Sequence, residues 1–519
     1  MKKLLQFLLS GILFISCQTT KKTAFNQMVN TENTYFYAID LVNVEKDKVF
    51  VTLLTPKSNL EKGRFVIPKL VPGYYAAMDF GQHISDFKAL DNAGNPLKTE
   101  HLDKNSWWVY DLKNLHSISY LVDDGWDDAY PRQGTAKSPG SMFMKDSVFV
   151  INYNSLIGYF EEIKETPYQV TITKPKSFYG SSAIKAVQKD ATTDIISTAN
   201  YRDLVDAPIL YCVPDTAYIN VGDTKVLVSL YSKEGKHFAK TLAEPLKNLL
   251  KNQQAYLGGQ LPVKDYAFLI YHEMAPKGNF LGDGLEHNNS TLCIFAAHDL
   301  NALPEHLFDV ASHEFFHIIT PLSIHSKEIQ FYDYLNPVLS KHLWLYEGMT
   351  EYATIHMPIK QKMIKLEHFA SNIEAKVKGM AQFNNDLSFT LLSKYAMEKQ
   401  ESYMNFYQKG ALIGLCLDIK LRELSDGKMG TQELMQALVK KYGKNMPFED
   451  NELFDVITQM TYPEIRSFFK EYVEGARPFP LKETLFKVGF DLDDAKKTVR
   501  LMPNLSEKQL VLRRYWINE

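Results

Sequence analysis

The sequence predicts a multidomain α+β protein, in which an N-terminal antiparallel β-sandwich is followed by a mainly α-helical domain. At 519 residues the chain is too long for one ordinary core. Its first part alternates short β-branched and aromatic runs with turn residues, whereas its second part carries amphipathic helical patterns. With 45% hydrophobic and 23% charged residues, the composition is that of a globular protein.

The charge balance excludes one class of partner. The formal net charge is −3 at pH 7, and loss of Lys2 and Lys3 with the leader described below would take it to −5. Proteins that bind nucleic acid carry clustered Lys and Arg, and no large basic block occurs in this chain. We therefore expect no nucleic-acid partner, and no partner protein is predicted either.

Residues 1–16 predict an export signal. Two lysines precede an apolar run, residues 4–15, which is too short to span a bilayer and has the length of a signal-peptide core. Ser16 stands directly before Cys17, which resembles the lipobox of bacterial lipoproteins, where the Cys becomes lipidated. Ordinary secretion with an incidental Cys is the alternative. We expect a lipidated Cys17 and a polar tether over residues 17–33.

This leader predicts a place in the bacterial cell envelope. The lipid on Cys17 would anchor the protein to a membrane, and no later stretch is apolar enough to be a transmembrane helix. The residues that follow Cys17 are Gln-Thr-Thr-Lys-Lys, without an acidic cluster, which favours the periplasm-facing side.

The other cysteines are Cys212, Cys293 and Cys416. They are far apart, odd in number and set among apolar neighbours, so we expect them to be small buried side chains. One disulfide between two of them is the alternative.

The predicted β domain covers residues 34–214. Its strand patterns include residues 49–53, 63–68 and 107–110, and residues 92–96 form a turn signal.

The second predicted domain covers residues 215–478, and a short segment, residues 479–519, follows it. A strand pattern at residues 225–231 and another at 266–271 accompany the helices. The predicted helices are residues 236–257, 304–319, 343–356, 363–380, 406–424, 431–442 and 462–474. We expect Pro321 to close the second of these helices and Pro358 the third, because proline disrupts a helix interior.

Residues 313–317, His-Glu-Phe-Phe-His, are typical of a zinc-peptidase helix. Residues four apart share one helix face, so His313 and His317 can both direct an imidazole at one ion. Glu314 then reaches a water at that ion and can act as its general base. Only three positions of the motif are fixed, so two histidines on an ordinary helix are the alternative.

The next predicted helix supplies a third ligand. A catalytic zinc needs three protein ligands and an open position, and Glu347 follows His317 by thirty residues. Glu351 lies one helical turn further on, where it can accept a hydrogen bond from the outward ring nitrogen of a zinc histidine. A solvated carboxylate is the alternative for Glu351.

His325 and His342 compete for the third-ligand position. A metzincin would need Gly at position 320 and His at position 323, but the chain has Thr320 and Ser323. We expect both histidines to be packing or substrate-side groups.

Motifs over most of the chain carry a family resemblance. They are residues 71–75, 84–89, 106–109 and 204–208 in the first domain, and 284–287, 313–317, 331–334 and 343–352 in the second. Together they resemble the glycyl aminopeptidase family of gluzincin zinc metallopeptidases. The resemblance implies a thermolysin-like catalytic domain with one Zn²⁺ per chain.

The resemblance also implies two further roles. Residues 284–287 resemble a strand whose Glu holds the free α-amino group of the substrate, so Glu286, with Gly284, is the candidate amine-binding site; a turn carboxylate is the alternative. Tyr407 resembles the tyrosine that donates a hydrogen bond to the oxyanion, and the alternative is one more of 29 tyrosines.

The sequence departs from the family at two places. Residues 318–327 replace the usual Trp-Asn and Arg-rich segment, so substrate preference is the least transferable property. Many members end in a PDZ domain, but about forty residues follow residue 480, too few for one.

The resulting hypothesis is a zinc-dependent metallopeptidase that hydrolyses peptide substrates, as an aminopeptidase for small N-terminal residues such as Gly or Ala. One alternative is a zinc endopeptidase. The other is a non-catalytic envelope-binding lipoprotein with a vestigial peptidase domain, against which the intact set of ligands, base and oxyanion donor argues.

Overall fold

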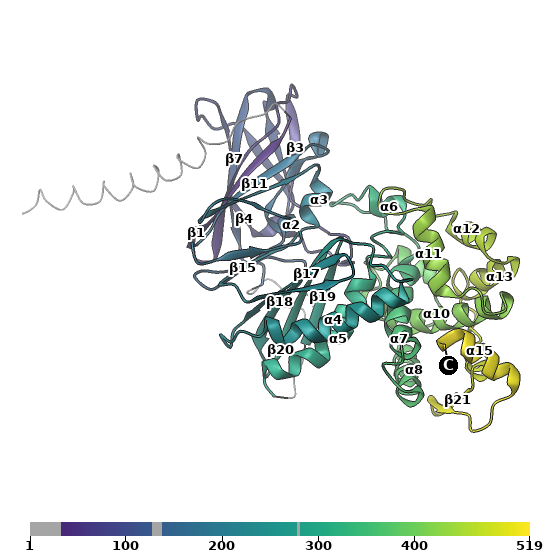
Figure 1. The fold of residues 1–519 in the computed structure, drawn as a ribbon. Coiled ribbons are helices and arrows are strands. Elements are labelled where there is room, and N and C mark those ends of the chain that lie inside the picture. The colour runs from purple at the N-terminus through teal and green to yellow at the C-terminus, as the bar shows by residue number, and fades with distance from the viewer. Residues whose placement is uncertain (1–32, 127–136, 278–280, 519) are drawn as a thin grey trace, which may run out of the picture. The chain divides into compact units, whose positions relative to one another are not determined.

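The computed structural model of the chain describes residues 33–126, 137–277 and 281–518. The predicted signal peptide, Cys17 and all but the end of the tether lie outside the described residues. The chain divides into two compact units (Figure 1). The N-terminal unit contains residues 33–69 and Asp79–Val213, and the C-terminal unit contains Leu70–Met78 and the chain from Pro214 onward. The sequence had assigned residues 70–78 to the first domain.

The N-terminal unit consists of three β-sheets. Their strand orders are β13-β14-β11-β1-β2-β7-β4, β10-β3-β6-β5 and β12-β15-β9-β8. The strands are β1 (Tyr35–Glu45), β2 (Lys48–Leu54), β3 (Lys62–Val66), β4 (Ile84–Asp91), β5 (Thr99–Asp103), β6 (Ser106–Tyr110), β7 (Leu115–Asp123), β8 (Met142–Met144), β9 (Val148–Ile151), β10 (Tyr159–Phe160), β11 (Tyr168–Thr173), β12 (Tyr179–Ser181), β13 (Val187–Asp190), β14 (Thr193–Thr198) and β15 (Ile209–Cys212). Short helices are η1 (Phe80–His83), η2 (Leu112–Asn114), η3 (Glu161–Ile163), α2 (Tyr153–Leu156) and α3 (Tyr201–Val205).

Aromatic side chains join two of these sheets. Phe65 on β3 packs against Phe87 on β4 and Tyr120 on β7, with ring centroids 5.4 and 6.1 Å away. Strand β2 shows why the sequence forms this layer, because every second side chain of its Lys-Val-Phe-Val-Thr-Leu run is buried. One pair departs from the predicted antiparallel pattern, since β1 and β11 run parallel.

The C-terminal unit begins with a five-stranded sheet of order β16-β17-β18-β20-β19. The strands are β16 (Thr216–Val221), β17 (Thr224–Ser232), β18 (Asp265–Met274), β19 (Leu281–His287) and β20 (Ser290–Ala297). Helices α4 (Ala239–Tyr256) and α5 (Leu303–Phe316) lie side by side against the sheet (Figure 1) and share one hydrophobic core with it. Strands β18 and β20 are buried along nearly their whole length, and their central residues, Ala-Phe-Leu-Ile-Tyr in β18 and Leu-Cys-Ile-Phe-Ala-Ala in β20, are apolar rather than alternating.

The remaining helices surround a second core. They are α6 (Lys327–Gln330), η5 (Trp344–Met349), α7 (Thr350–Lys360), α8 (Leu366–Met380), α9 (Phe389–Lys394), α10 (Asn405–Leu424), α11 (Thr431–Lys441), α12 (Leu453–Met460), α13 (Pro463–Tyr472), α14 (Leu481–Lys487) and α15 (Glu507–Ile517), with short turns η4 (Leu300–Ala302) and η6 (Gln400–Ser402) and the hairpin β21 (Phe490–Asp493) and β22 (Thr498–Leu501). The predicted fold class, a mainly β domain followed by a helical one, is therefore confirmed.

The predicted helix at residues 343–356 differs in two ways. Its first part, η5, is a π-helix, and α7 continues through Pro358 to Lys360, so the prediction that Pro358 ends the helix is wrong. Met357 and Ile359 beside the proline are buried. Their packing offsets the hydrogen bond that proline cannot make.

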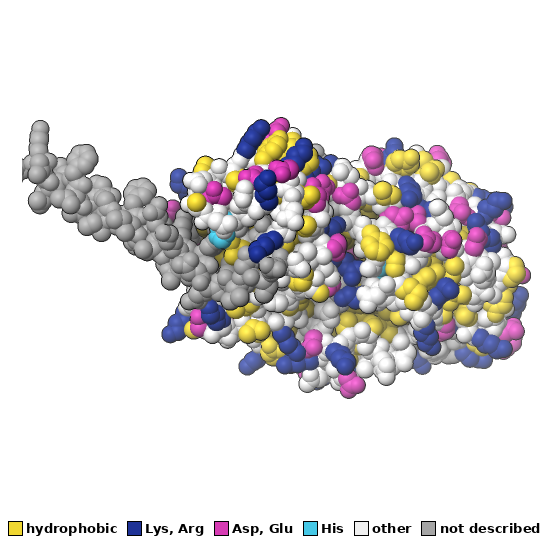
Figure 2. Space-filling view, turned by 90° about the horizontal axis from the view of Figure 1, so that it is seen from above, with side chains coloured by type: hydrophobic (Ala, Val, Ile, Leu, Met, Phe, Trp, Pro, Cys, Tyr) yellow, Lys and Arg dark blue, Asp and Glu magenta, His cyan; other side chains and the backbone are white. Residues whose placement is uncertain are grey.

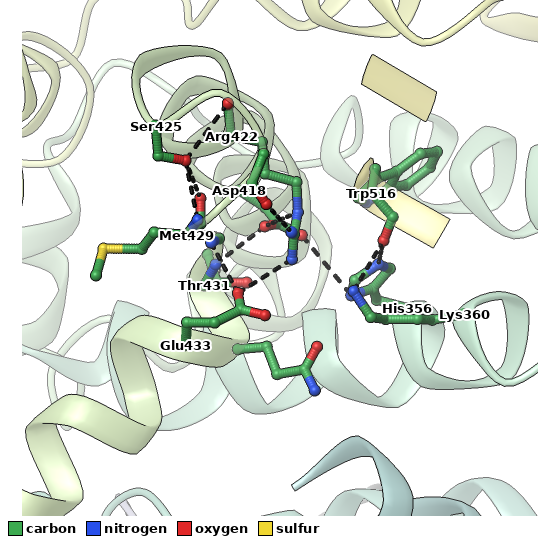
Figure 3. Close-up of polar contacts among 12 residues, drawn as sticks. His356, Lys360, Asp418, Arg422, Ser425, Met429, Thr431, Glu433 and Trp516 are labelled. Carbon is green, nitrogen blue, oxygen red and sulfur yellow. Dashed lines mark hydrogen bonds and ion pairs between the residues drawn. The ribbon is translucent and has the colours of Figure 1, made fainter. Parts of the chain in front are cut away.

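The C-terminal segment is part of the helical core, because α15 closes a buried polar network (Figure 3). His356 Nε2 and Lys360 Nζ, both on α7, donate hydrogen bonds of 3.2 Å to the carbonyl of Trp516 on α15. On α10, Arg422 pairs with Asp418 at 3.1 Å, and Asp418 lies 3.7 Å from His356.

The surface charge, the cysteines and the helices of the described residues are those of a globular protein. On the face seen in Figure 2, basic and acidic side chains are interspersed. Cys212, Cys293 and Cys416 are buried free thiols. Among the described residues, no helix combines the length and the apolar character that a membrane crossing requires.

Candidate metal centre

Helix α5 presents the two histidines of the motif. Leu303, Leu307, Ala311 and Phe315 recur every four residues, are buried and pack toward the sheet. His313 and His317 lie on another face of the helix, and their ring centroids are 4.7 Å apart.

Glu347 reaches the same point from η5. Its Oε2 lies 3.4 Å from His313 Nε2 and 3.7 Å from His317 Nε2, and these three ligand atoms all lie within 4.8 Å of one another. Helix η5 approaches α10 closely because two glycines meet there. A Cβ on Gly348 would lie only 2.8 Å from the Cα of Gly410.

The Nδ1 atoms of both histidines are hydrogen-bonded within the protein. His313 Nδ1 lies 2.8 Å from Glu351 Oε2, which is the contact that the sequence predicts. His317 Nδ1 lies 2.9 Å from the carbonyl oxygen of Thr320, so this nitrogen must carry the proton. In a neutral imidazole with a protonated Nδ1, the lone pair is on Nε2. Both Nε2 atoms therefore face Glu347 as potential metal ligands.

The charges around the histidines favour a cation. Burial lowers the pKa of His313, but the neighbouring carboxylates of Glu347 and Glu351 raise it to about 10, so these carboxylates favour positive charge at this position. Burial raises the pKa of Glu351, but the Lys376 ammonium, 2.5 Å away, brings it to about 2. Glu351 is thus a charged acceptor for His313, and Lys376 was not identified from the sequence.

The donor set fits zinc. His313 Nε2 and Glu347 Oε2 are buried and have no hydrogen-bond partner among the described residues. Unpartnered buried polar atoms are costly unless a ligand satisfies them. Two imidazole nitrogens and one carboxylate oxygen match a catalytic zinc site, in which a fourth position stays open.

Two further carboxylates lie beside this set. Glu286 on β19 and Glu314 on α5 form a second group with His317, again within 4.8 Å. The strand can approach Glu314 because Gly284 has no side chain; a Cβ there would lie 2.7 Å from Glu314 Oε1. Burial raises the pKa of Glu314, the charge of His313 opposes this, and Glu286 adds to the rise.

Tyr407 on α10 lies over the first histidine. Its ring centroid is 5.3 Å from that of His313, and its hydroxyl is 3.4 Å from that of Tyr403. Burial and the negative charge of Glu347 raise the pKa of Tyr407 well above its usual value. The phenol is therefore neutral and able to donate a hydrogen bond.

The two competing histidines lie elsewhere. His325 contacts the Pro321 carbonyl and Gln330 at 2.8 and 2.7 Å. Buried His342 contacts the Asp450 carbonyl at 2.8 Å. Neither belongs to the groups that could hold a metal ion among the described residues.

Two family models match the chain. Residues 36–213 match the M61 peptidase N-terminal domain, and residues 306–413 match the M61 glycyl aminopeptidase domain. A comparison with curated protein sequences gave no match.

Solved structures share the fold. An aminopeptidase N family protein from Idiomarina loihiensis is 22% identical with a TM-score of 0.75, over 88% of this chain and 79% of that one. An M1 zinc metallopeptidase from Deinococcus radiodurans is 13% identical with a TM-score of 0.52, over 86% of this chain and 95% of that one. With both M61 domains matched, and with a group of side chains that could hold a metal ion, the chain belongs to the M61 glycyl aminopeptidase family of zinc peptidases.

Proposed function

We propose that the protein is an aminopeptidase that binds one Zn²⁺ per chain through His313, His317 and Glu347 and releases small N-terminal residues such as Gly or Ala. The observation that carries this proposal is the group of Glu286, Glu314 and His317 within 4.8 Å, because it puts a spare carboxylate next to a metal ligand and the base. The family's description as glycyl aminopeptidases supports the small first residue.

The chemistry follows from these positions. When bound, zinc acidifies water and polarises the scissile carbonyl as a Lewis acid. Glu314 takes the proton of the attacking water and delivers it to the leaving amine. Tyr407 donates a hydrogen bond to the oxyanion, a contact typically worth about 3 kcal/mol in the transition state.

Glu286 makes the enzyme an exopeptidase in this proposal. Its carboxylate pairs with the α-ammonium of the substrate, so a peptide binds productively when its first residue lies at the metal. An internal peptide bond would leave this carboxylate without a partner, which costs binding energy. Among the solved relatives of similar fold, a mutant of the Deinococcus M1 enzyme was crystallised with a Tyr-Ser-Ala substrate.

The general base is tested by Glu314→Gln. This variant should keep its zinc but lose at least about 100-fold in kcat, because general-base catalysis contributes about 100- to 10,000-fold. The matched control is Glu305→Gln, at an exposed position in the first turn of the same helix. Zinc content by elemental analysis and turnover of an aminoacyl anilide give the result; near-wild-type turnover in Glu314→Gln would contradict the mechanism.

Exopeptidase and endopeptidase action are separated by one pair of substrates. Glycyl anilide should be cleaved and N-acetylglycyl anilide should not. Equal cleavage of both would make the enzyme an endopeptidase. A series of glycyl, alanyl and leucyl anilides then measures the preference for small first residues. Purified protein without zinc would instead favour a non-catalytic binding role.

We also propose that Cys17 anchors the enzyme to a membrane of the cell envelope, facing the periplasm. The support is the leader sequence alone. Cys17→Ala should move the protein from the membrane fraction to the soluble envelope fraction, whereas unchanged fractionation would exclude a lipid anchor at this residue.

A further inference from the structure

A short segment of the first domain's sequence belongs to the C-terminal unit. Leu70–Met78 follows β3 in the chain, yet it packs with the helical core. The backbone N–H of Leu70 donates to the Tyr334 carbonyl at 3.1 Å, and the Gln400 side chain donates to the Tyr75 carbonyl. Residues 71–75 are among the motifs that carry the family resemblance, but the sequence alone assigns no role to them.

Gly73 lies directly on the proposed amine anchor. Its φ is +83°, a conformation that favours glycine, and a Cβ there would lie 2.6 and 2.7 Å from the two carboxylate oxygens of Glu286. No side chain can stand between this backbone and the carboxylate. Gly73 therefore limits the positions that the Glu286 carboxylate can take.

Tyr75 carries a hydroxyl that no described residue satisfies. The residue is 6% exposed, and its hydroxyl is buried without a hydrogen-bond partner among the described residues. Most buried polar groups in proteins have a partner, and the exceptions concentrate where a ligand or catalysis supplies one.

The surroundings of Tyr75 connect it to the metal centre. Its ring packs on Tyr403 at 5.6 Å, the Tyr403 hydroxyl is 3.4 Å from that of Tyr407, and Tyr407 packs on His313. Burial raises the pKa of Tyr75 well above its usual value, and the negative charges of Glu347 and Glu286 raise it further. The phenol is therefore neutral, in a region whose negative potential attracts a cation.

We propose that Leu70–Met78 completes the recognition of the substrate's N-terminus, with Gly73 fixing the Glu286 carboxylate and the Tyr75 phenol oxygen accepting a hydrogen bond from the α-ammonium. An ammonium has three N–H donors, so it can bond to Tyr75 and Glu286 together. The proposal rests on the proposed aminopeptidase function, since it takes Glu286 as the amine anchor. It adds Tyr75 as a substrate-binding residue and Gly73 as a positioning residue.

Two small zinc ligands test it. Glycine hydroxamate and acetohydroxamate share the metal-binding group, but glycine hydroxamate alone carries an ammonium. Their affinities for the zinc-loaded full chain are measured by calorimetry, after each variant is shown to hold as much zinc as the wild type. The wild type should bind glycine hydroxamate more tightly. Equal affinities would overturn the amine anchor itself and with it the exopeptidase function.

Tyr75→Phe removes a hydroxyl and no packing. It should weaken glycine hydroxamate about 10-fold or more, the cost of a hydrogen bond to a charged group, and leave acetohydroxamate unchanged. Tyr395→Phe, at a tyrosine that is 53% exposed, is the matched control. Unchanged binding of both ligands, or equal weakening of both, in a wild type that discriminates between them would overturn the role of Tyr75 alone.

Gly73→Ala tests the positioning role. It should weaken glycine hydroxamate about 10-fold by displacing the Glu286 carboxylate, and spare acetohydroxamate. Gly259→Ala controls for backbone strain, because Gly259 has φ +97° but a Cβ there would meet no atom of the described residues within 4 Å. If both glycine variants weaken glycine hydroxamate equally, Gly73 has no positioning role.

Discussion

At the scale of single residues, the metal centre depends on partners that hold the ligands. Glu351 accepts a hydrogen bond from His313 Nδ1 and forms an ion pair with Lys376. The three side chains come from α5, α7 and α8 and form one chain of contacts that supports His313. Such an arrangement fixes the ring orientation and raises the basicity of the imidazole toward the metal.

Glu351→Gln should therefore weaken zinc binding. It keeps a hydrogen-bond acceptor for His313 but removes the negative charge, so we expect the zinc Kd to rise about 10- to 100-fold. Glu367→Gln, at an exposed position on α8, is the control. Competition with a chromophoric chelator measures both values, and an unchanged Kd for Glu351→Gln would remove its role in supporting the ligand.

At the scale of elements, α7 links the metal centre to the C-terminus. It carries Glu351 near its start and His356 and Lys360 near its end, where both contact α15. Burial lowers the pKa of His356 to about 3, although the Asp418 carboxylate opposes the shift.

This buried histidine makes stability depend on pH. An unfolded histidine titrates near pKa 6.5, so below that pH the unfolded chain binds a proton that folded His356 excludes. The stabilisation is complete above pH 6.5 and falls by up to about 1.4 kcal/mol per pH unit down to about pH 3.

His356→Gln should reduce the pH dependence of unfolding. In metal-free protein, the free energy of unfolding should fall less steeply between pH 6.5 and 5 than in the wild type, a range in which unperturbed carboxylates stay ionised. His342, with a pKa of about 4, keeps part of the dependence. Urea denaturation measures the slopes, and His237→Gln, at a residue 75% exposed, is the control. Equal slopes in wild type and His356→Gln would contradict the assignment.

At the scale of the whole molecule, the proposed zinc site connects segments that are distant in sequence. The proposed ligands come from the end of α5 and from η5, and Glu286, Glu314 and Glu347 bring three carboxylates close together. Bound zinc would offset their mutual repulsion, and because it would bind the folded state, it would stabilise the C-terminal unit by mass action.

Removal of zinc should therefore lower the Tm. Free zinc at about 1,000 times its Kd contributes about 4 kcal/mol, which corresponds to a rise of several degrees in Tm. Calorimetric scans with chelator and with zinc measure the change, and Glu464→Gln, at an exposed position, should respond like the wild type. Glu347→Gln should lose most of the response; a full response in that variant would exclude Glu347 as a ligand.

The sequence by itself determined the order of the two folds and the types of side chain in the metal centre. Alternation in residues 49–53 and four-residue recurrence around His313 are local patterns, and they follow from the geometry of a strand and a helix. Glu347 and Glu351 could be found because they lie one turn apart in a strongly helical stretch.

Only the tertiary structure decided which distant groups meet. The π-helical turn at Glu347 and the continuation of α7 through Pro358 depend on packing that overrides local propensity. Lys376 is one lysine among many in the sequence, and Tyr75 lies in a motif to which the sequence assigns no role. No spacing links either residue to His313 or Glu286. Their positions follow from long-range packing in the helical core, which a local pattern does not encode.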